Sequence, residues 1–421
     1  MSDSNVTRCA RAIREALDEE LVNEIGRESG FCRKLRKFTP IRAAWTIISG
    51  LASGTIDTLA DLLRLFTDLS GETMGYKPFH DRLSAPGFPE FFRQVLEHLM
   101  TTLIGPIYGN FGYAKSFSDI LVQDGSSFGL NESLKKAFPG RFTTKAPAAV
   151  EVHCTFSLFE GQPVAIGVAP DVESERDFLP EPEELKGKLL LMDAGYMNLR
   201  YIERVKEHGG DVITPAKGRA NPKILACYSG IAKGSKIIGK KLKEVRLPRR
   251  DVDLLVECMR EGRIKQQIRL VGVYVKKEKR HVLLYTTLDS DLYPALQVST
   301  LYRLRWQIEL FFKECKSHTD LKKFQTANPR IAEGLIWASM TAALFRRFLL
   351  HHAFAGTGKR SAPFVAASMS WMFFRDLGRS AVHSYRSLRL VLKRILSLLR
   401  NLSKRTNPKR LDSMVKLGIG P

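Results

Sequence analysis

Two aspartates stand at the ends of apolar runs, each beside a glycine. Asp124 ends the segment FSDILVQD and is followed by Gly125, and Asp193 ends KLLLMD and is followed by Ala-Gly. A carboxylate at the carboxyl end of a central strand, next to a glycine, is where open α/β sheets place their chemistry. Asp-Gly is also a common turn pair. Either aspartate alone is therefore ambiguous, and the repeated context favours a functional site.

A third polar group lies in the segment LYRLRWQIELFFKECK, residues 301–316. At helical periodicity its apolar residues fall on one side, and the opposite stripe carries Tyr302, Arg305, Glu309, Lys313 and Lys316. Such a stripe can be a solvated face with i,i+4 ion pairs worth a few tenths of a kcal/mol each. Periodicity alone does not separate a solvated face from a functional one.

The net charge indicates the partner. The 421 residues hold 66 Lys and Arg against 44 Asp and Glu, a net charge of +22, which favours a polyanion. The longest apolar stretch, 334–345, is shorter than the roughly 20 residues of a membrane span, and the N-terminus lacks a signal-peptide apolar block. Six cysteines show no Cys-x-x-Cys pair. We expect a nucleic-acid partner, no membrane association and a cytoplasmic location.

The pattern of the chain predicts an α/β fold with helical ends. Strand and helix signals alternate from about residue 117 to 215, short β-rich pieces follow, and helical periodicity returns after residue 294. The C-terminal helices are strongly basic. The predicted regions are 1–115, a helical DNA-binding domain; 116–215, the first part of the core; 216–290, a β-rich insertion; 291–330, the second part of the core, with the Glu309 helix; and 331–421, a basic helical region.

The helical segment has a specific spacing. From Tyr302 to Lys316 it runs Tyr-x2-Arg-x3-Glu-x6-Lys, which resembles the Tyr-Arg-Glu-Lys signature of bacterial insertion-sequence transposases of insertion sequence family four. Asp124 and Asp193 resemble the first and second acidic motifs of that family. The resemblance implies a DDE-type enzyme with a ribonuclease-H-like catalytic core interrupted by a β-rich insertion. It also implies that Asp124, Asp193 and Glu309 form the catalytic, metal-binding triad.

The implied chemistry is two-metal-ion phosphodiester cleavage. Mg²⁺ prefers carboxylate, water and phosphate oxygens, and two such ions activate water and stabilise the leaving oxygen. We expect two Mg²⁺ ions, with Mn²⁺ able to substitute, hydrolysis at the transposon ends and strand transfer into target DNA. The expected partners are double-stranded terminal inverted repeats, target DNA and a second copy of the chain, which would act in association with the bacterial nucleoid. The expected DNA-binding residues are Tyr302, Arg305, Lys313 and Lys316.

Two alternatives and one detail stay open. The positive charge would equally suit a catalytically inactive DNA-binding protein derived from a transposase, whereas it argues against a carboxylate-pair glycosidase. Some relatives form a DNA hairpin and receive a flipped base on an aromatic residue of the insertion. None of the four tryptophans lies between residues 216 and 290, and Tyr274 or Tyr285 could substitute.

Overall fold

The structure is a computed structural model. It describes residues 3–54, 56–103, 116–216, 221–231, 236–260, 264–318, 326–355 and 362–403. The basic residues after 403 that were assigned to the C-terminal region lie outside this part of the chain.

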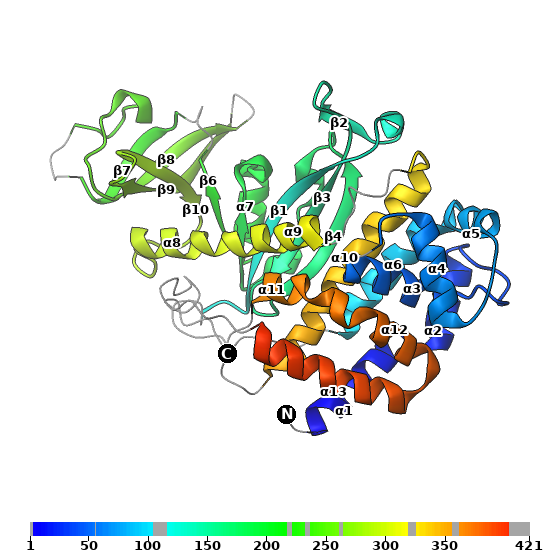
Figure 1. The fold of residues 1–421 in the computed structure, drawn as a ribbon. Coiled ribbons are helices and arrows are strands. Elements are labelled where there is room, and N and C mark those ends of the chain that lie inside the picture. Colours follow the sequence, from blue (N-terminus) through cyan, green and yellow to red (C-terminus); the bar gives the residue numbers. More distant parts are fainter. Residues whose placement is uncertain are drawn as a thin grey trace.

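The described residues form a mixed sheet of ten strands with a layer of helices beside it (Figure 1). The strand order is β2-β3-β1-β5-β6-β10-β9-β8-β7, and β4 pairs with β3. The strands are β1 Asp119–Gly129, β2 Pro139–Phe142, β3 Ala146–Ser157, β4 Gln162–Pro170, β5 Lys188–Met192, β6 Asp211–Pro215, β7 Lys223–Ser229, β8 Val252–Arg260, β9 Ile264–Val275 and β10 Arg280–Thr286. The predicted mixed α/β architecture is confirmed.

The centre of the sheet is parallel. β5 lies between β1 and β6 and is parallel to both, and α7 (Leu199–Glu207) connects β5 to β6. The β5 residues from Leu189 to Met192 are completely buried, because one face of β5 packs under α7 and the other under the helical layer. A strand covered on both faces is apolar throughout, as the run KLLLM predicts.

The β-rich stretch continues this sheet. β10 pairs antiparallel with β6 through Tyr285 and Thr214, and β9, β8 and β7 extend outward from it. The stretch therefore consists largely of strands, and these share one hydrogen-bonded sheet with the core. β7 and the short strand β2 were not predicted from the sequence.

The predicted helix across residues 301–316 is interrupted. α8 (Ala295–Tyr302) ends in a tight 3-10 turn, Arg303–Arg305, before α9 (Trp306–His318) begins. The expectation of one regular helix was wrong at this turn, because three residues per turn replace 3.6 there and rotate the side chains away from an ideal stripe. The side toward the sheet is nevertheless apolar as predicted, with Leu304, Ile308 and Phe311 completely buried.

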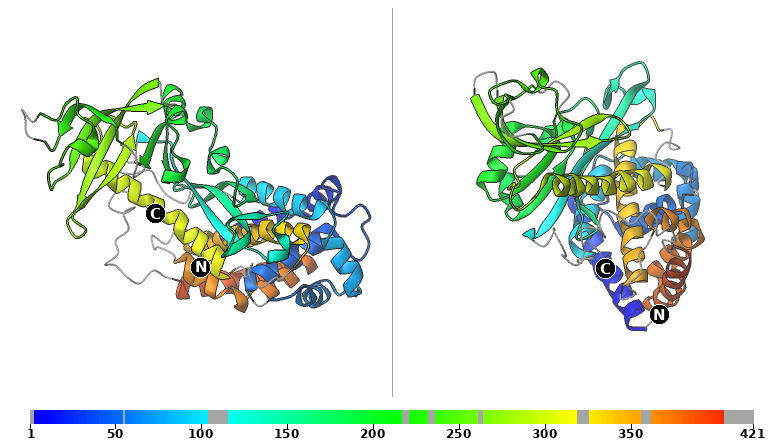
Figure 2. Two further views of the ribbon diagram at one scale, coloured as in Figure 1. Left: turned by 90° about the horizontal axis from the view of Figure 1, so that it is seen from above. Right: turned by 90° about the vertical axis from the view of Figure 1, so that its left-hand side faces the viewer.

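Both ends of the chain contribute to the helical layer (Figure 2). Its central helix is α10, which contacts α6, α3 and α13 and is buried along most of its length. Because they share this core, the N-terminal and C-terminal helices pack together. The layer comprises α1 Asp3–Ala16, α2 Glu19–Glu28, α3 Pro40–Ser53, α4 Leu59–Ser70, α5 Tyr76–Leu83, α6 Gly87–Thr102, α10 Pro329–Phe354, α11 Pro363–Ser368, α12 Phe374–His383 and α13 Tyr385–Leu402.

Within the described ranges, no helix combines the length and the apolar character needed to cross a bilayer.

Candidate active site

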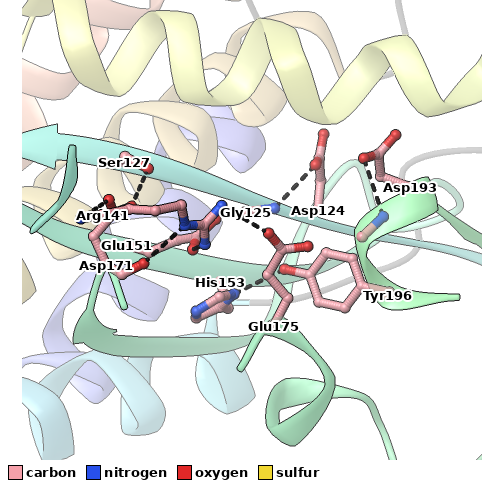
Figure 3. Close-up of polar contacts among 11 residues, drawn as sticks. Asp124, Gly125, Ser127, Arg141, Glu151, His153, Asp171, Glu175, Asp193 and Tyr196 are labelled. Atoms are coloured by element: carbon pink, nitrogen blue, oxygen red, sulfur yellow. Dashed lines mark hydrogen bonds and ion pairs between the residues drawn. The ribbon is translucent and has the colours of Figure 1, made fainter. Parts of the chain in front are cut away.

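Sheet register places the two aspartates side by side. The parallel pairing of β1 with β5 ends at Gln123 opposite Met192, so Asp124 and Asp193 are the next residues of adjacent strands. Side chains alternate between the two faces of a strand, so Asp124 lies on the same face as Val122 and Asp193 on the same face as Leu191. Both of these residues belong to the core that includes the apolar side of α9. Figure 3 shows the two carboxylates pointing in the same direction, toward the helical segment above them.

The local backbone of the two aspartates differs. Asp193 follows β5 and caps the 3-10 turn Ala194–Tyr196, where its carboxylate accepts a hydrogen bond from the backbone N–H of Gly195 at 3.5 Å. Asp124 lies inside β1, and its carboxylate accepts the N–H of Gly125 at 3.0 Å. The expectation that Asp124 ends its strand was wrong, since β3 continues to pair with β1 beyond the end of β5.

Arg305 connects Asp124 to Glu309. Its Nη1 lies 2.5 Å from Asp124 Oδ2, and its Nη2 donates to Glu309 Oε1 on the next turn of helix. The Arg305 and Asp124 side chains are only 18% and 15% exposed, so this contact is largely shielded from water. An arginine expected to contact DNA therefore binds two of the expected metal-binding carboxylates in the absence of DNA.

The charges of the three carboxylates influence one another. Burial raises the pKa of Asp124 to about 6, Arg305 opposes this rise, and the negative charges of Asp193 and Glu309 add to it. Nearby like charges disfavour the ionised form of a carboxyl group, so the two acidic neighbours act in the same direction as burial. The structure thus brings Asp193 and Glu309 within electrostatic reach of Asp124.

The other residues of the predicted signature differ in their exposure to solvent. Tyr302 is largely buried beside Arg305, whose guanidinium carbon lies 6.0 Å from the ring centroid, and burial raises the pKa of its hydroxyl. Lys316 is exposed and its Nζ lies 5.1 Å from the ring centroid of Phe128. Lys313 is also exposed on α9. The two lysines present positive charge to solvent, whereas Tyr302 supports Arg305.

The donor set suits a hard divalent cation. Carboxylate oxygens are the ligands that Mg²⁺ and Mn²⁺ prefer, and a cation, the Arg305 guanidinium, already lies between Asp124 and Glu309. Among the described residues, however, no three acidic, histidine or cysteine side chains are already spaced to hold a metal ion. Arg305 occupies one oxygen of each of two candidate ligands, Asp124 Oδ2 and Glu309 Oε1.

A group of charged residues beneath the aspartates was missed in the sequence. Glu151 on β3 and Glu175 both contact Arg141 on β2. The sequence offered one signal, since polar residues such as Glu151 and His153 alternate with the apolar residues of β3. Their significance depends on the pairing of β3 with β1, which the sequence does not show.

The two tyrosines considered for a flipped base differ in exposure. Tyr285 is 1% exposed, and its ring is packed inside the core beside Cys258. Tyr274 is partly exposed and packs against His281. Only Tyr274 of this pair presents surface to a ligand.

Comparisons with known proteins find similar transposases. Residues 115–345 match the family model described as "Transposase DDE domain". Ninety residues are 43% identical to the putative transposase InsL for insertion sequence element IS186A of Escherichia coli (strain K12), covering 21% of this chain and 23% of that protein. The chain thus aligns with less than a quarter of that relative.

Longer alignments connect the chain to further transposases. It is 27% identical over 245 residues to the transposase for insertion sequence element IS1151 of Clostridium perfringens, covering 48% of this chain and 50% of that one. It is 22% identical over 364 residues to the transposase for insertion sequence element IS231C of Bacillus thuringiensis subsp. berliner, covering 77% and 76%.

A solved structure also aligns with the chain. The cryo-EM structure of a piggyBac transposase synaptic complex with hairpin DNA aligns with a TM-score of 0.49 and 12% identity, covering 97% of this chain and 88% of that one. The family assignment depends on the sequence match, which spans more than half of the chain and includes both aspartates and Glu309. The chain belongs to the transposase DDE domain family.

Proposed function

We propose that the chain is the DNA transposase of an insertion sequence, which hydrolyses phosphodiester bonds at the transposon ends and then joins the exposed 3′-hydroxyl to target DNA. The observation that carries this proposal is that Asp124 in β1 and Asp193, directly after the adjacent strand β5, lie next to each other, with Glu309 held to Asp124 through Arg305. The core would be ribonuclease-H-like. Its support is a β1 flanked by an antiparallel hairpin, β3 and β4, and by the parallel strands β5 and β6.

In this proposal Asp124, Asp193 and Glu309 hold two Mg²⁺ ions, and Mn²⁺ substitutes for them. The bound ions would supply an activated water and stabilisation of the leaving oxygen. Asp124 must be ionised to act as a ligand, and its pKa of about 6 allows this at neutral pH.

Arg305 would change partners when DNA binds. A guanidinium binds phosphate as well as carboxylate through paired N–H donors, so an incoming phosphate can draw it from Asp124 and Glu309. Lys313 and Lys316 would contact the backbone nearby, and phosphate contacts of this kind position DNA without reading its sequence. Tyr302 would keep the arginine aligned.

The proposed partners are double-stranded terminal inverted repeats, target DNA and a second copy of the chain, because two transposon ends must be brought together. The N-terminal helices would contribute DNA contacts, and the protein would act at the bacterial nucleoid in the cytoplasm.

A cleavage assay tests the function. Purified protein incubated with labelled duplex carrying its own terminal repeats should nick the transposon end in Mg²⁺ or Mn²⁺. Asp124→Asn, Asp193→Asn and Glu309→Gln should each abolish nicking while gel-shift binding persists. The control Glu132→Gln changes an exposed glutamate whose nearest cation, Lys135, is 3.8 Å away, and should cleave normally. Full cleavage by a site variant would remove that residue from the proposal.

The second candidate is a DNA-binding protein without catalysis. The observation in its favour is the net charge of +22, which suits DNA binding with or without catalysis. Retained DNA binding by the wild-type chain, with no nicking in either metal and no Mn²⁺ uptake with DNA, would establish this alternative.

A further inference from the structure

A network of ion pairs lies beside and below the two aspartates in Figure 3. At its centre is Arg141, whose Nη2 lies 3.0 Å from Glu151 Oε2 and whose Nη1 lies 3.2 Å from Glu175 Oε1. The Arg141 backbone N–H donates to Asp171 at 2.9 Å, and Ser127 on β1 donates to the other oxygen of that carboxylate at 2.5 Å. The network therefore ties β2, β3, the end of β4 and β1 together.

Each glutamate of this network touches one aspartate motif. A Cβ added to Gly125 would lie 2.5 Å from Glu151 Oε1, and a Cβ added to Gly195 would lie 1.6 Å from Glu175 Oε2. Neither glycine has a left-handed backbone conformation. A side chain at either glycine would therefore have to displace the carboxylate of the glutamate beside it.

Charge connects the network to the site as well. Glu151 is 6% exposed, and burial together with the charge of Glu175 raises its pKa to about 7, against the opposing effect of Arg141. Asp124 is among the charges that act on Glu151. The arrangement resembles the outer-layer partners that hold metal ligands in place in other proteins.

We propose that Arg141, Glu151 and Glu175 are positioning residues that set the separation and orientation of the Asp124 and Asp193 carboxylates. Arg141 links the two glutamates, and each glutamate packs against the residue beside or near one aspartate, so a shift of either glutamate moves a metal-binding oxygen. This inference rests on the proposed function, since it assigns the network to the same metal site.

Gly195→Ala tests the proposal without removing a charge. The new methyl group displaces the Glu175 carboxylate from Arg141, and we expect the affinity for Mn²⁺ to fall about tenfold, within the range of outer-layer substitutions. Free Mn²⁺ is measured by electron paramagnetic resonance with duplex carrying the terminal repeat, and the uptake of duplex alone is subtracted. The Mn²⁺ concentration for half-maximal cleavage should rise by the same factor, with DNA affinity unchanged.

The double variant Gly195→Ala, Glu175→Ala separates positioning from simple crowding. Removal of the glutamate relieves the clash but leaves Arg141 with only one glutamate partner. We expect Mn²⁺ affinity to remain low in the double variant. Recovery of wild-type affinity would overturn the proposal, because the glutamate would then matter only as an obstacle.

Arg141→Gln tests the centre of the network against a matched control. Arg204→Gln removes an arginine of similar exposure, which pairs with Glu183 at 3.3 Å on the surface of α7, and should bind Mn²⁺ as the wild type does. Arg141→Gln should bind Mn²⁺ about tenfold more weakly. If it does not fold, Arg141→Lys replaces it, since one ammonium group cannot reproduce the fork between two carboxylates.

The outcomes distinguish this proposal from the proposed function. Wild-type Mn²⁺ affinity in folded Gly195→Ala and in the folded Arg141 variant overturns the positioning role, whatever the wild type cleaves. Mn²⁺ uptake by the wild type without nicking, combined with weaker uptake by the variants, refutes the transposase activity and supports the positioning role. Absence of Mn²⁺ uptake by the wild type refutes both.

Discussion

Replacement of Arg305 by glutamine tests whether this arginine neutralises the carboxylates in the absence of metal. Fully buried ion pairs cost about 3–5 kcal/mol when one partner is removed, and exposed pairs cost about 0–1 kcal/mol. Arg305 and Asp124 are 18% and 15% exposed, which places the expected loss between these limits. We expect Arg305→Gln to lower the free energy of unfolding by about 2 kcal/mol at pH 7.5.

The loss should depend on pH in a defined direction. The pKa of Asp124 is raised to about 6 in the folded protein, and removal of Arg305 raises it further. At pH 5 Asp124 is mostly protonated with or without the arginine, so Arg305 loses its charged Asp124 partner there and keeps the more exposed pair with Glu309, which is of the kind worth about 0–1 kcal/mol. The difference between variant and wild type should therefore shrink to under about 1 kcal/mol at pH 5.

Urea unfolding of the metal-free proteins at pH 5 and pH 7.5 measures both effects. Added Mn²⁺ should stabilise Arg305→Gln more than the wild type, because the arginine no longer competes for the carboxylates. The control Arg93→Gln removes half-exposed i,i+3 and i,i+4 pairs on α6 and should lose under about 1 kcal/mol at both pH values. An equal loss at both pH values for Arg305→Gln would refute the electrostatic explanation.

Three further substitutions test the supports of the site. Burial raises the pKa of Asp119 from 3.8 to about 6, so the stability that its protonated form provides is present below pH 4 and is lost as pH rises through 6. In urea unfolding, Asp119→Asn should therefore be more stable than the wild type by on the order of 2–3 kcal/mol at pH 7.5, with no gain at pH 3.5. Glu314 is 1% exposed and binds Arg346 and Arg347 of α10; Glu314→Gln should cost about 3 kcal/mol, and a loss under 1 kcal/mol would show that α9 is anchored otherwise. Arg269 binds Asp253 and the backbone before α8; Arg269→Gln should cost about 3–5 kcal/mol by chemical denaturation, and an unchanged midpoint would contradict this.

The sequence predicted the elements that carry the aspartates because their signals are local. An unbroken apolar run such as KLLLM is typical of a strand buried on both faces, and the next residue then lies at the edge of the parallel pairing. The apolar side of α9 was predicted for a similar reason, since helical periodicity is contained within one segment.

The sequence could not predict features that depend on pairing between distant segments. Arg141 meets Glu151 and Glu175 only because β2 pairs with β3 and the chain returns past β4, and no local pattern encodes that meeting. β10 likewise has an ordinary strand pattern, and its pairing with β6 depends on the tertiary fold rather than on a local sequence pattern. The contact of Arg305 with Asp124, 181 residues away, was also not predicted.

The central claim is that three carboxylates from distant parts of the chain share divalent ions at a DNA end. Anomalous diffraction at the manganese edge, from crystals of the protein with Mn²⁺ and a terminal-repeat duplex, tests it most directly. The account predicts manganese peaks in contact with Asp124, Asp193 and Glu309, with Arg305 moved to a DNA phosphate. Manganese bound elsewhere, with Arg305 still joining Asp124 to Glu309 in crystals whose protein cleaves DNA, would contradict it.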